Sequence, residues 1–456
     1  MNEGKETESE SGKNFNPAYR NTRKRIVLAS AILLFCLACP PPKDSLDVRD
    51  IDDSAVPQWA KDRILYAPNS IIGKYRTSSG GQLKPHPDYP SGNVVVIRVA
   101  TSDWPINTAA TKTYIDGIFK DDGPPHRSIA GYYKENSYGQ FTLTSVKVPN
   151  WVQLNGNLSS YGDIEGNPYF IKEVLKRAGV NWLALDGNVD FSISRQEAQI
   201  VVLIPNGTPQ AGYASMRYLN CGSVSVDLPM IGPVAFKLGM RPIVFFSLWA
   251  QGQPDAATNP IRSHSSVIHE LNHAFFELPD RYYANSGTGQ YDIMVLDQNW
   301  MHLTMYDKLK IGWVEPTFLN KHLSKKVAFP NAESTNAALV LVKPFGTAQD
   351  ERFEYWVVEN RNRSWSTGDY DDNFPEDGLA VWYVSEGTSA NPGYDDVRLV
   401  NASTPSIDPD LYANPGLGAL FRNFNAQSLL IDANGQWTGL WFRDVSAPGQ
   451  FMTAEF

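Results

Sequence analysis

The sequence is poor in cysteine, and two of its few cysteines lie close to the N-terminus. Only three occur in 456 residues: Cys36, Cys39 and Cys221. A single cysteine in the remainder of the chain excludes a disulfide framework and a zinc site built from thiolates. We expect Cys221 to behave as a small buried apolar residue.

The sequence also lacks an excess of positive charge and any internal repeat. Lys and Arg number 40 against 49 Asp and Glu, which gives a net charge of −9 at pH 7. This balance provides no basic surface for nucleic acid, so we expect no nucleic-acid partner. A hydrophobic content of 42% with 20% charged residues is typical of a globular protein, and the length suffices for two or three domains.

Long apolar runs are scarce. The run Ile26–Cys39 is shorter than the roughly twenty residues of a membrane-spanning helix, and it follows a basic stretch that ends at Arg25. This order is typical of a secretory signal. Leu37-Ala38-Cys39 resembles the end of a bacterial lipoprotein signal, in which the cysteine is lipidated after cleavage; a retained membrane anchor is the alternative. Residues 1–39 therefore predict export, with the body either secreted or tethered to the cell envelope.

Histidine is scarce too, yet two of the seven histidines stand together in His269-Glu270-Leu271-Asn272-His273. On a helix, positions i and i+4 share a face and lie roughly 6 Å apart along the axis, so both imidazoles can bind one metal ion. Glu270 lies one step around the helix, where its carboxylate can reach a water on the metal. Zinc lowers the pKa of that water to about 7, and the carboxylate can accept its proton.

The surroundings of this motif favour a helix. Ile268, Leu271 and Phe275 recur at helical spacing, and Ser263, Ser265 or Ser266 can cap its start. Pro279 disfavours helix at the preceding residue, so we expect the helix to end near Phe276 or Glu277. The alternative is a chance pentapeptide with one buried and one solvated histidine, and the helical context argues against it.

The distribution of apolar and polar residues along the chain predicts an α+β protein. Residues 40–90 are rich in Pro, Asp, Ser and Gly and suggest a spacer or a pro-like segment with little regular structure. Residues 91–322 contain buried strands at 94–99, 200–204 and 243–249 before the zinc helix, the order of a zincin-like catalytic domain. Residues 323–456 contain short alternating strands, which predict a β-rich, sandwich-like C-terminal domain.

Further stretches stand in a fixed order on both sides of the zinc motif. They are Val94 to Asp103, Tyr133–Gly139, Leu278–Tyr282, Tyr291–Met294, His302-Leu303, Lys308–Trp313, Tyr355–Arg361 and Asp377–Tyr383. Together with the zinc helix, these stretches resemble the secreted bacterial zinc metallopeptidases of the immune inhibitor A family. The resemblance covers about residues 94–456, and the collinear order makes it more specific than the zinc motif alone.

The resemblance implies a metzincin-like peptidase. His269 and His273 would bind zinc, Glu270 would act as the general base, and Met294 would form a methionine turn beneath the metal. The chain departs from the family at the end of the helix. The family usually carries glycine three residues after the second histidine, where this chain has Phe276, and one extra residue precedes Leu278-Pro279-Asp280.

Two carboxylates compete to be the third zinc ligand. Glu277 lies at i+4 from His273, but three ligands along one straight helix would span roughly 12 Å and could not surround one ion. Asp280 follows Pro279, in chain that must leave the helix and can fold back over the metal. It also occupies the aspartate of the Leu-Pro-Asp match. We therefore predict Asp280 as the third ligand.

Other candidates carry weaker signals. His302 and Tyr291 could line the cleft, although a structural hydrogen bond and core packing are the favoured interpretations. Tyr282, Tyr283 and Tyr306 are further possible oxyanion donors, with the same alternative. The acidic loop around Asp369–Asn373, with Glu376 and Asp377, offers oxygen ligands for Ca²⁺, but a solvated turn is favoured because the loop lacks known calcium-binding spacing. Trp365 and Trp382 are expected to be core residues rather than a carbohydrate platform.

Taken together, these patterns predict an exported zinc-dependent endopeptidase that hydrolyses protein or peptide substrates. One alternative is a zinc hydrolase of a non-peptide amide or ester, because the same activated water serves both reactions. Another is a binding protein on a peptidase scaffold with weak or no turnover. The intact Glu270 argues against the last, since a pure binding protein has no need of a general base.

Overall fold

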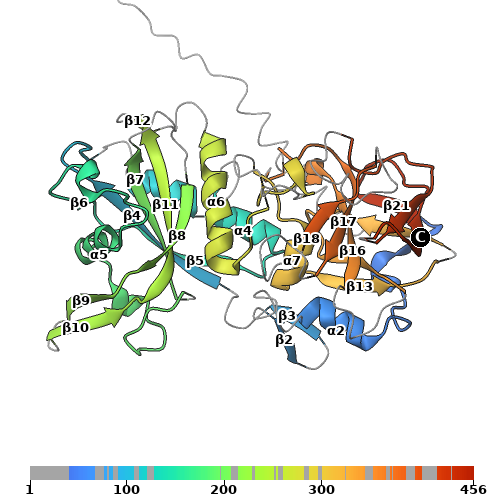
Figure 1. The fold of residues 1–456 in the computed structure, drawn as a ribbon, viewed down its shortest axis with the longest axis horizontal. Helices are drawn as coiled ribbons and strands as arrows, with labels where there is room; N and C mark the ends of the chain where they lie inside the picture. Colours follow the sequence, from blue (N-terminus) through green and yellow to red (C-terminus); the bar gives the residue numbers. More distant parts are fainter. Residues whose placement is uncertain are drawn as a thin grey trace, which may run out of the picture. The chain divides into compact units, whose positions relative to one another are not determined.

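The structure is a computed structural model, shown as a ribbon in Figure 1. Contacts divide the chain into Met1–Lys43 and a compact unit, Asp44–Phe456, and the predicted boundary at residue 323 falls inside this unit. The mixed α+β class is confirmed. The structure describes residues 41–66, 76–79, 82–85, 91–106, 112–120, 128–195, 197–206, 214–228, 232–250, 253–254, 260–281, 287–295, 300–323, 325–344, 353–365, 370–371, 373–386, 396–402, 418–432 and 434–456.

The helix that carries the His269–His273 motif packs against a seven-stranded sheet. Its main path has the order β12-β11-β7-β4-β5, with β8 beside β11 and β6 beside β4. Strands β4, β5, β6, β7 and β11 pair in parallel, whereas β8 and β12 run antiparallel to β11. The strands are β4 (Ser91–Ala100), β5 (Thr142–Lys147), β6 (Val152–Gln153), β7 (Gln199–Asn206), β8 (Ala214–Asn220), β11 (Met240–Ala250) and β12 (Gln253–Pro254).

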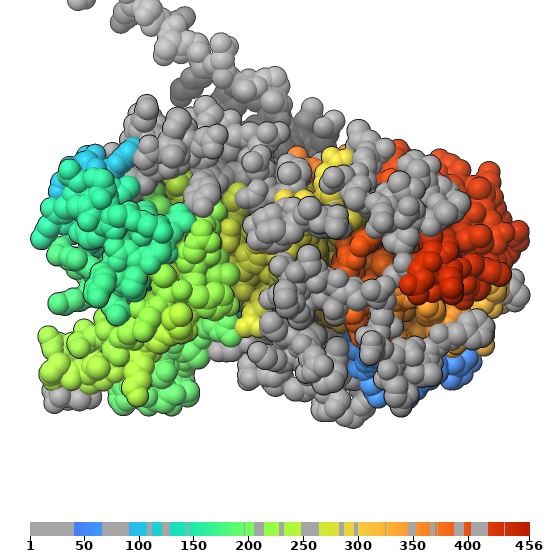
Figure 2. Space-filling model, viewed as in Figure 1, coloured from blue at the N-terminus to red at the C-terminus, as the bar shows by residue number. Residues whose placement is uncertain are grey.

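The central strands of this sheet are buried on both faces, which explains their continuous apolar runs. Val94 and Val244 point into one core, shared with helix α6 (Pro260–Phe276). Val95 and Ile243 point into another, shared with helix α5 (Pro168–Arg177). A separate hairpin, β9 (Ser223–Leu228) and β10 (Gly232–Lys237), lies at the surface in the space-filling view (Figure 2). The predicted buried strands at 94–99, 200–204 and 243–249 thus correspond to β4, β7 and β11, whereas this hairpin was not predicted.

The structure describes helices α3 (Lys112–Phe119), α4 (Ile129–Asn136), α5 (Pro168–Arg177), α6 (Pro260–Phe276) and α7 (Met305–Ile311), and α6 is the helix predicted around His269 and His273. The Asn167 side chain caps the start of α5, and Gly312, with φ of 95°, ends α7 in a left-handed conformation. The prediction that a serine caps the zinc helix is wrong. Helix α6 already begins at Pro260, a residue favoured in the first turn because it has no N–H to satisfy.

The C-terminal half is built on a five-stranded sheet of order β13-β15-β16-β17-β18. One face packs on the core around α6, and the other packs on a second core shared with a three-stranded sheet, β1-β14-β21, and a hairpin, β19-β20. Trp382 is fully buried, as predicted, whereas the Trp365 side chain lies outside the described residues. The strands are β1 (Ser45–Asp47), β13 (Glu315–Leu319), β14 (Lys326–Pro330), β15 (Ala337–Val342), β16 (Glu354–Arg361), β17 (Gly378–Ser385), β18 (Asp396–Leu399), β19 (Ser428–Ile431), β20 (Trp437–Phe442) and β21 (Phe451–Glu455).

The expectation of little regular structure in residues 40–90 is wrong. Strand β1 pairs in parallel with β14, and helix α2 (Gln58–Tyr66) is followed by a small hairpin, β2 (Arg76–Ser79) and β3 (Gln82–Pro85). Ala60 and Ile64 of α2 are fully buried in the core around α6, and Arg63 pairs with Glu386 at 2.8 Å. Ala60 and Ile64 are four residues apart and share one face of α2, but the polar composition of the whole segment gave no indication that this face is buried.

This packing predicts a large effect of Ile64→Ala. Removing a fully buried isoleucine side chain leaves a cavity and should lower the free energy of unfolding by about 2–5 kcal/mol, as measured by urea denaturation. Ile106→Ala is the matched control, because that side chain is 46% exposed and its truncation should change the free energy by no more than about 0.5 kcal/mol. Equal, small effects of the two substitutions would contradict the placement of α2 in the core.

None of the described helices is long and apolar enough to cross a membrane. The segment Ile26–Cys39, on which the predictions of export and tethering rest, lies outside the described residues.

Candidate metal centre

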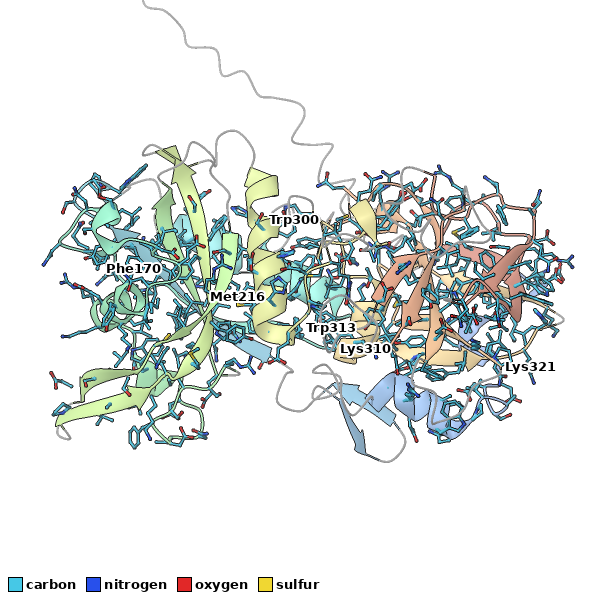
Figure 3. The ribbon with its side chains drawn as sticks, viewed as in Figure 1. Phe170, Met216, Trp300, Lys310, Trp313 and Lys321 are labelled. Atoms are coloured by element: carbon cyan, nitrogen blue, oxygen red, sulfur yellow. The ribbon has the colours of Figure 1, made fainter. Side chains whose placement is uncertain are left out.

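Helix α6 is held from several sides, which fixes the direction of its side chains. It runs along β8 and β11 (Figure 1), and its apolar residues are buried in the core. Near its C-terminal end, the Gln199 side chain of β7 donates to the Ala274 carbonyl at 3.1 Å, which satisfies one of the carbonyls that a helix end leaves unpaired. Trp313, labelled in Figure 3, lies with its ring 5.1 Å from that of Phe276.

Glycine at position 92 allows α6 to approach β4 closely. A Cβ atom at Gly92 would lie 2.6 Å from the ring of Phe275, a separation that side chains do not tolerate. A larger residue at this position would therefore require Phe275 or helix α6 to move away from the sheet.

Three potential ligand atoms converge beyond α6. The Nε2 atoms of His269 and His273 lie 3.1 Å apart, and Asp280 Oδ1 lies 3.0 Å from the first and 3.1 Å from the second. Among the described residues, these three form the one group of histidine, cysteine and acidic side chains with spacing suitable for a metal ion. Glu277, the competing candidate, is not in the group.

The other ring nitrogen of each histidine contacts a backbone carbonyl. His269 Nδ1 lies 2.8 Å from the Ile293 oxygen, and His273 Nδ1 contacts the Leu278 oxygen. A carbonyl can only accept, so each Nδ1 must carry its proton and donate it. In the neutral imidazoles, both Nε2 lone pairs therefore point toward each other and toward the carboxylate. Either a proton on one Nε2, donated to Asp280, or a metal cation among the three atoms stabilises this arrangement.

The separations of these three atoms are compatible with a metal ion bound among them. Burial disfavours the imidazolium form of His269, but its hydrogen bond with Asp280 and the charge of Glu270 outweigh burial and raise the pKa of His269 to about 9. The site thus favours a positive charge. With bonds of about 2.0–2.2 Å and tetrahedral angles, two zinc ligands lie roughly 3.4 Å apart, close to the separations of the three atoms. Three protein ligands of this kind leave a fourth position open.

The chain leaves α6 in a way that separates Asp280 from Glu277. Helix α6 ends at Phe276, as predicted, and Glu277 adopts a positive φ of 53°. Its carboxylate turns away to Arg195, with an N–O distance of 2.7 Å. The left-handed turn thus falls one residue later than the position at which the family resemblance places glycine. The extra residue lengthens the helix before the turn and leaves three steps from the turn to Asp280.

The segment around Met294 contacts His269 and Asn272 of α6. Met294 is fully buried, and its sulfur is 3.8 Å from the Asn272 side-chain nitrogen. Asn272 in turn accepts a hydrogen bond of 3.0 Å from the Tyr133 hydroxyl of α4. Because the neighbouring Ile293 supplies the carbonyl that orients His269, this turn supports the site through packing and one hydrogen bond, and Met294 is not among the potential ligands.

Glu270 differs from its neighbours on the helix in its exposure. The residues on either side of it are buried, whereas Glu270 is partly exposed, as is Asp280. The charge of Glu270 raises the pKa of His269, and its partial exposure leaves the carboxylate accessible to water, as a proton acceptor for water requires.

The other predicted site residues form hydrogen bonds with residues outside the His269–His273–Asp280 group. His302 is fully buried between Glu135, 2.8 Å from its Nε2, and Lys308, 3.2 Å from its Nδ1. Burial and the charge of Lys308 lower the pKa of His302. The hydroxyl of Tyr291 donates to Glu376 at 2.6 Å, and burial together with that carboxylate raises the pKa of Tyr291. These contacts favour the structural interpretation of both.

The remaining tyrosine and calcium candidates gain no support. Tyr306 is buried beneath the Arg281 guanidinium, and Tyr282 and Tyr283 lie outside the described residues, as do Asp369 and Asp372. In the described part of the acidic loop, both oxygens of Asp371 accept from Arg361 at 2.6 and 2.7 Å. Glu376 and Asp377 likewise pair with arginines, so these carboxylates are satisfied within the protein.

The individual roles of Arg281, Asp292 and Asp307 were missed by sequence reasoning. All three are buried, and the Arg281 guanidinium lies 2.7 Å from Asp292 and 2.8 Å from Asp307. The sequence did draw attention to their positions, because each lies inside or beside a stretch that carries the family resemblance. Nothing in the sequence indicated that the three charges meet.

Comparison of the sequence with protein-family models and with curated proteins gives no match.

Proposed function

We propose that the protein is a zinc-dependent endopeptidase. The observation that carries this proposal is the convergence of His269 Nε2, His273 Nε2 and Asp280 Oδ1 within 3.1 Å of one another, with each histidine oriented by a backbone carbonyl. Histidine and carboxylate ligands with one open position are the donor set of catalytic zinc sites. Hydrogen bonds from the opposite ring nitrogens are also typical of such sites.

The residues of this site have different roles in the proposed hydrolysis. A zinc ion held by His269, His273 and Asp280 would polarise a peptide carbonyl and lower the pKa of a water molecule. Glu270 accepts the proton of the attacking water and later delivers it to the leaving amine. The Ile293 and Leu278 carbonyls keep the two imidazoles in the tautomer that binds metal.

A peptide substrate is favoured over a non-peptide amide or ester by the resemblance to secreted metallopeptidases. The test is degradation of casein or gelatin by the purified protein, its loss after treatment with a chelator and its recovery on addition of zinc. A zinc-dependent esterase or amidase without proteolysis would support the alternative hydrolase. Stoichiometric zinc binding without any turnover would instead support a binding protein.

We further propose that the protein acts outside the cytoplasm, on the basis of the apolar run that follows Arg25. Cell fractionation distinguishes the forms: loss of membrane association in Cys39→Ser indicates a lipid anchor, whereas unchanged association indicates a retained one. A full-length cytoplasmic product would exclude export.

A further inference from the structure

A buried charge cluster lies immediately beyond the third ligand. Arg281 follows Asp280 directly, and its guanidinium Nη1 lies 2.7 Å from Asp292 Oδ2 and 2.8 Å from Asp307 Oδ2. Its Nη2 donates to the second oxygen of Asp307. Both aspartates are fully buried and Arg281 is 6% exposed, so one guanidinium joins three segments of the chain inside the protein.

These three segments include the ones that orient the metal ligands. The Arg281 backbone N–H donates to the Met294 carbonyl at 3.0 Å, and the other oxygen of Asp292 accepts from the Met294 N–H at 2.9 Å. Ile293, between Asp292 and Met294, supplies the carbonyl that orients His269. The cluster therefore fixes the chain beside Asp280 and the chain that supports His269 against each other.

Stability alone does not account for this cluster. Removing three charged groups from water costs several kcal/mol for each ion, and replacement by apolar residues is often neutral or stabilising. One positive and two negative groups also leave a net negative charge within the protein. Such a cluster is useful where a fixed geometry or a nearby cation is required, because bidentate contacts with a guanidinium restrict direction as well as distance.

We propose that Arg281, Asp292 and Asp307 are positioning residues that hold Asp280 and His269 in the geometry that binds the metal. This inference rests on the proposed function. The three residues do not touch the metal or the substrate. They act through the chain on either side of the ligands, and their removal should lower metal affinity more than stability.

The primary test is Asp307→Asn, with Asp371→Asn as the matched control. Both aspartates are fully buried and bind an arginine with two oxygens, but Asp371 binds Arg361 and is not in the metal-binding group. In each variant, the arginine keeps another carboxylate: Asp292 for Arg281, and Glu333 and Glu359 for Arg361. Neither change therefore leaves an arginine without a countercharge.

We expect Asp307→Asn to weaken zinc binding 10- to 100-fold in competition with a chelator, whereas Asp371→Asn should bind zinc as the parent does. Arg281→Lys, which keeps the charge but loses the fork, is the second variant and should weaken binding in the same range. The visible spectrum of the cobalt-loaded protein should change in both Asp307→Asn and Arg281→Lys, but not in the control.

The outcomes separate the inference from the proposed function. If the parent binds zinc and both cluster variants bind it equally well, with unchanged cobalt spectra, the positioning role is refuted and the proposed function stands. An equal loss of affinity in Asp371→Asn also refutes it, because the effect would then reflect general destabilisation. If the parent itself binds no zinc, both proposals fail.

Discussion

Glu270→Gln should abolish proteolysis while the protein remains folded and loaded with zinc. Glutamine has nearly the shape of glutamate but no carboxylate to accept a proton from water. Loss of a general base typically lowers the rate 10²- to 10⁴-fold. Because Glu270 is not one of the three converging ligands, zinc content measured by atomic absorption should not change.

The measurement is kcat on a fluorogenic peptide at saturating substrate, with zinc content and thermal unfolding determined on the same preparation. A variant that retains more than about a tenth of the parent rate would exclude Glu270 as the base. A variant that has lost its zinc would assign Glu270 to metal binding instead.

Asp280→Ala should purify with little or no zinc, whereas Glu277→Ala should be fully loaded. The Asp280 carboxylate lies within 3.1 Å of both imidazoles and, among the described residues, is the one acidic member of the candidate metal-binding group. Its removal leaves two histidines on one helix, which cannot surround a tetrahedral ion. The Glu277 carboxylate is 2.7 Å from Arg195 and contributes no ligand atom.

Glu277→Ala is a suitable control because its other consequences are small. The ion pair with Arg195 is partly exposed and should contribute no more than about 1 kcal/mol to stability. Alanine and glutamate also both have a Cβ, so the positive φ of 53° at this position disfavours them to a similar degree. Metal loss in Glu277→Ala with full loading of Asp280→Ala would reverse the assignment.

The local elements of the fold were predictable from the sequence. Strands such as β4 and β11 pack on both faces, so they appear as unbroken apolar runs, and helix α6 appears as an apolar face with two histidines four residues apart. The end of α6 was predictable because Pro279 restricts the backbone before it. These features depend on residues close together in the chain, where periodicity and steric limits act directly.

The N-terminal part of the compact unit was not predictable in the same way. Strand β1 is stabilised by pairing with β14, and Ile64 is buried by a core built largely from residues far away in the sequence. No local propensity marks such a segment, because its order comes from the surface that it covers. Composition alone therefore suggested a spacer.

The sequence by itself determined the chemistry of the candidate site: two imidazoles on one helical face, a carboxylate beside them and a turn that can bring another back. Sequence reasoning favoured Asp280 over Glu277, but only the tertiary structure shows how the chain returns: through the left-handed turn at Glu277 and a segment in which Arg281 is buried between Asp292 and Asp307. It also placed His302 among buried charges. Helical spacing is a property of neighbouring residues, whereas the position of a loop is set by the distant residues that contact it.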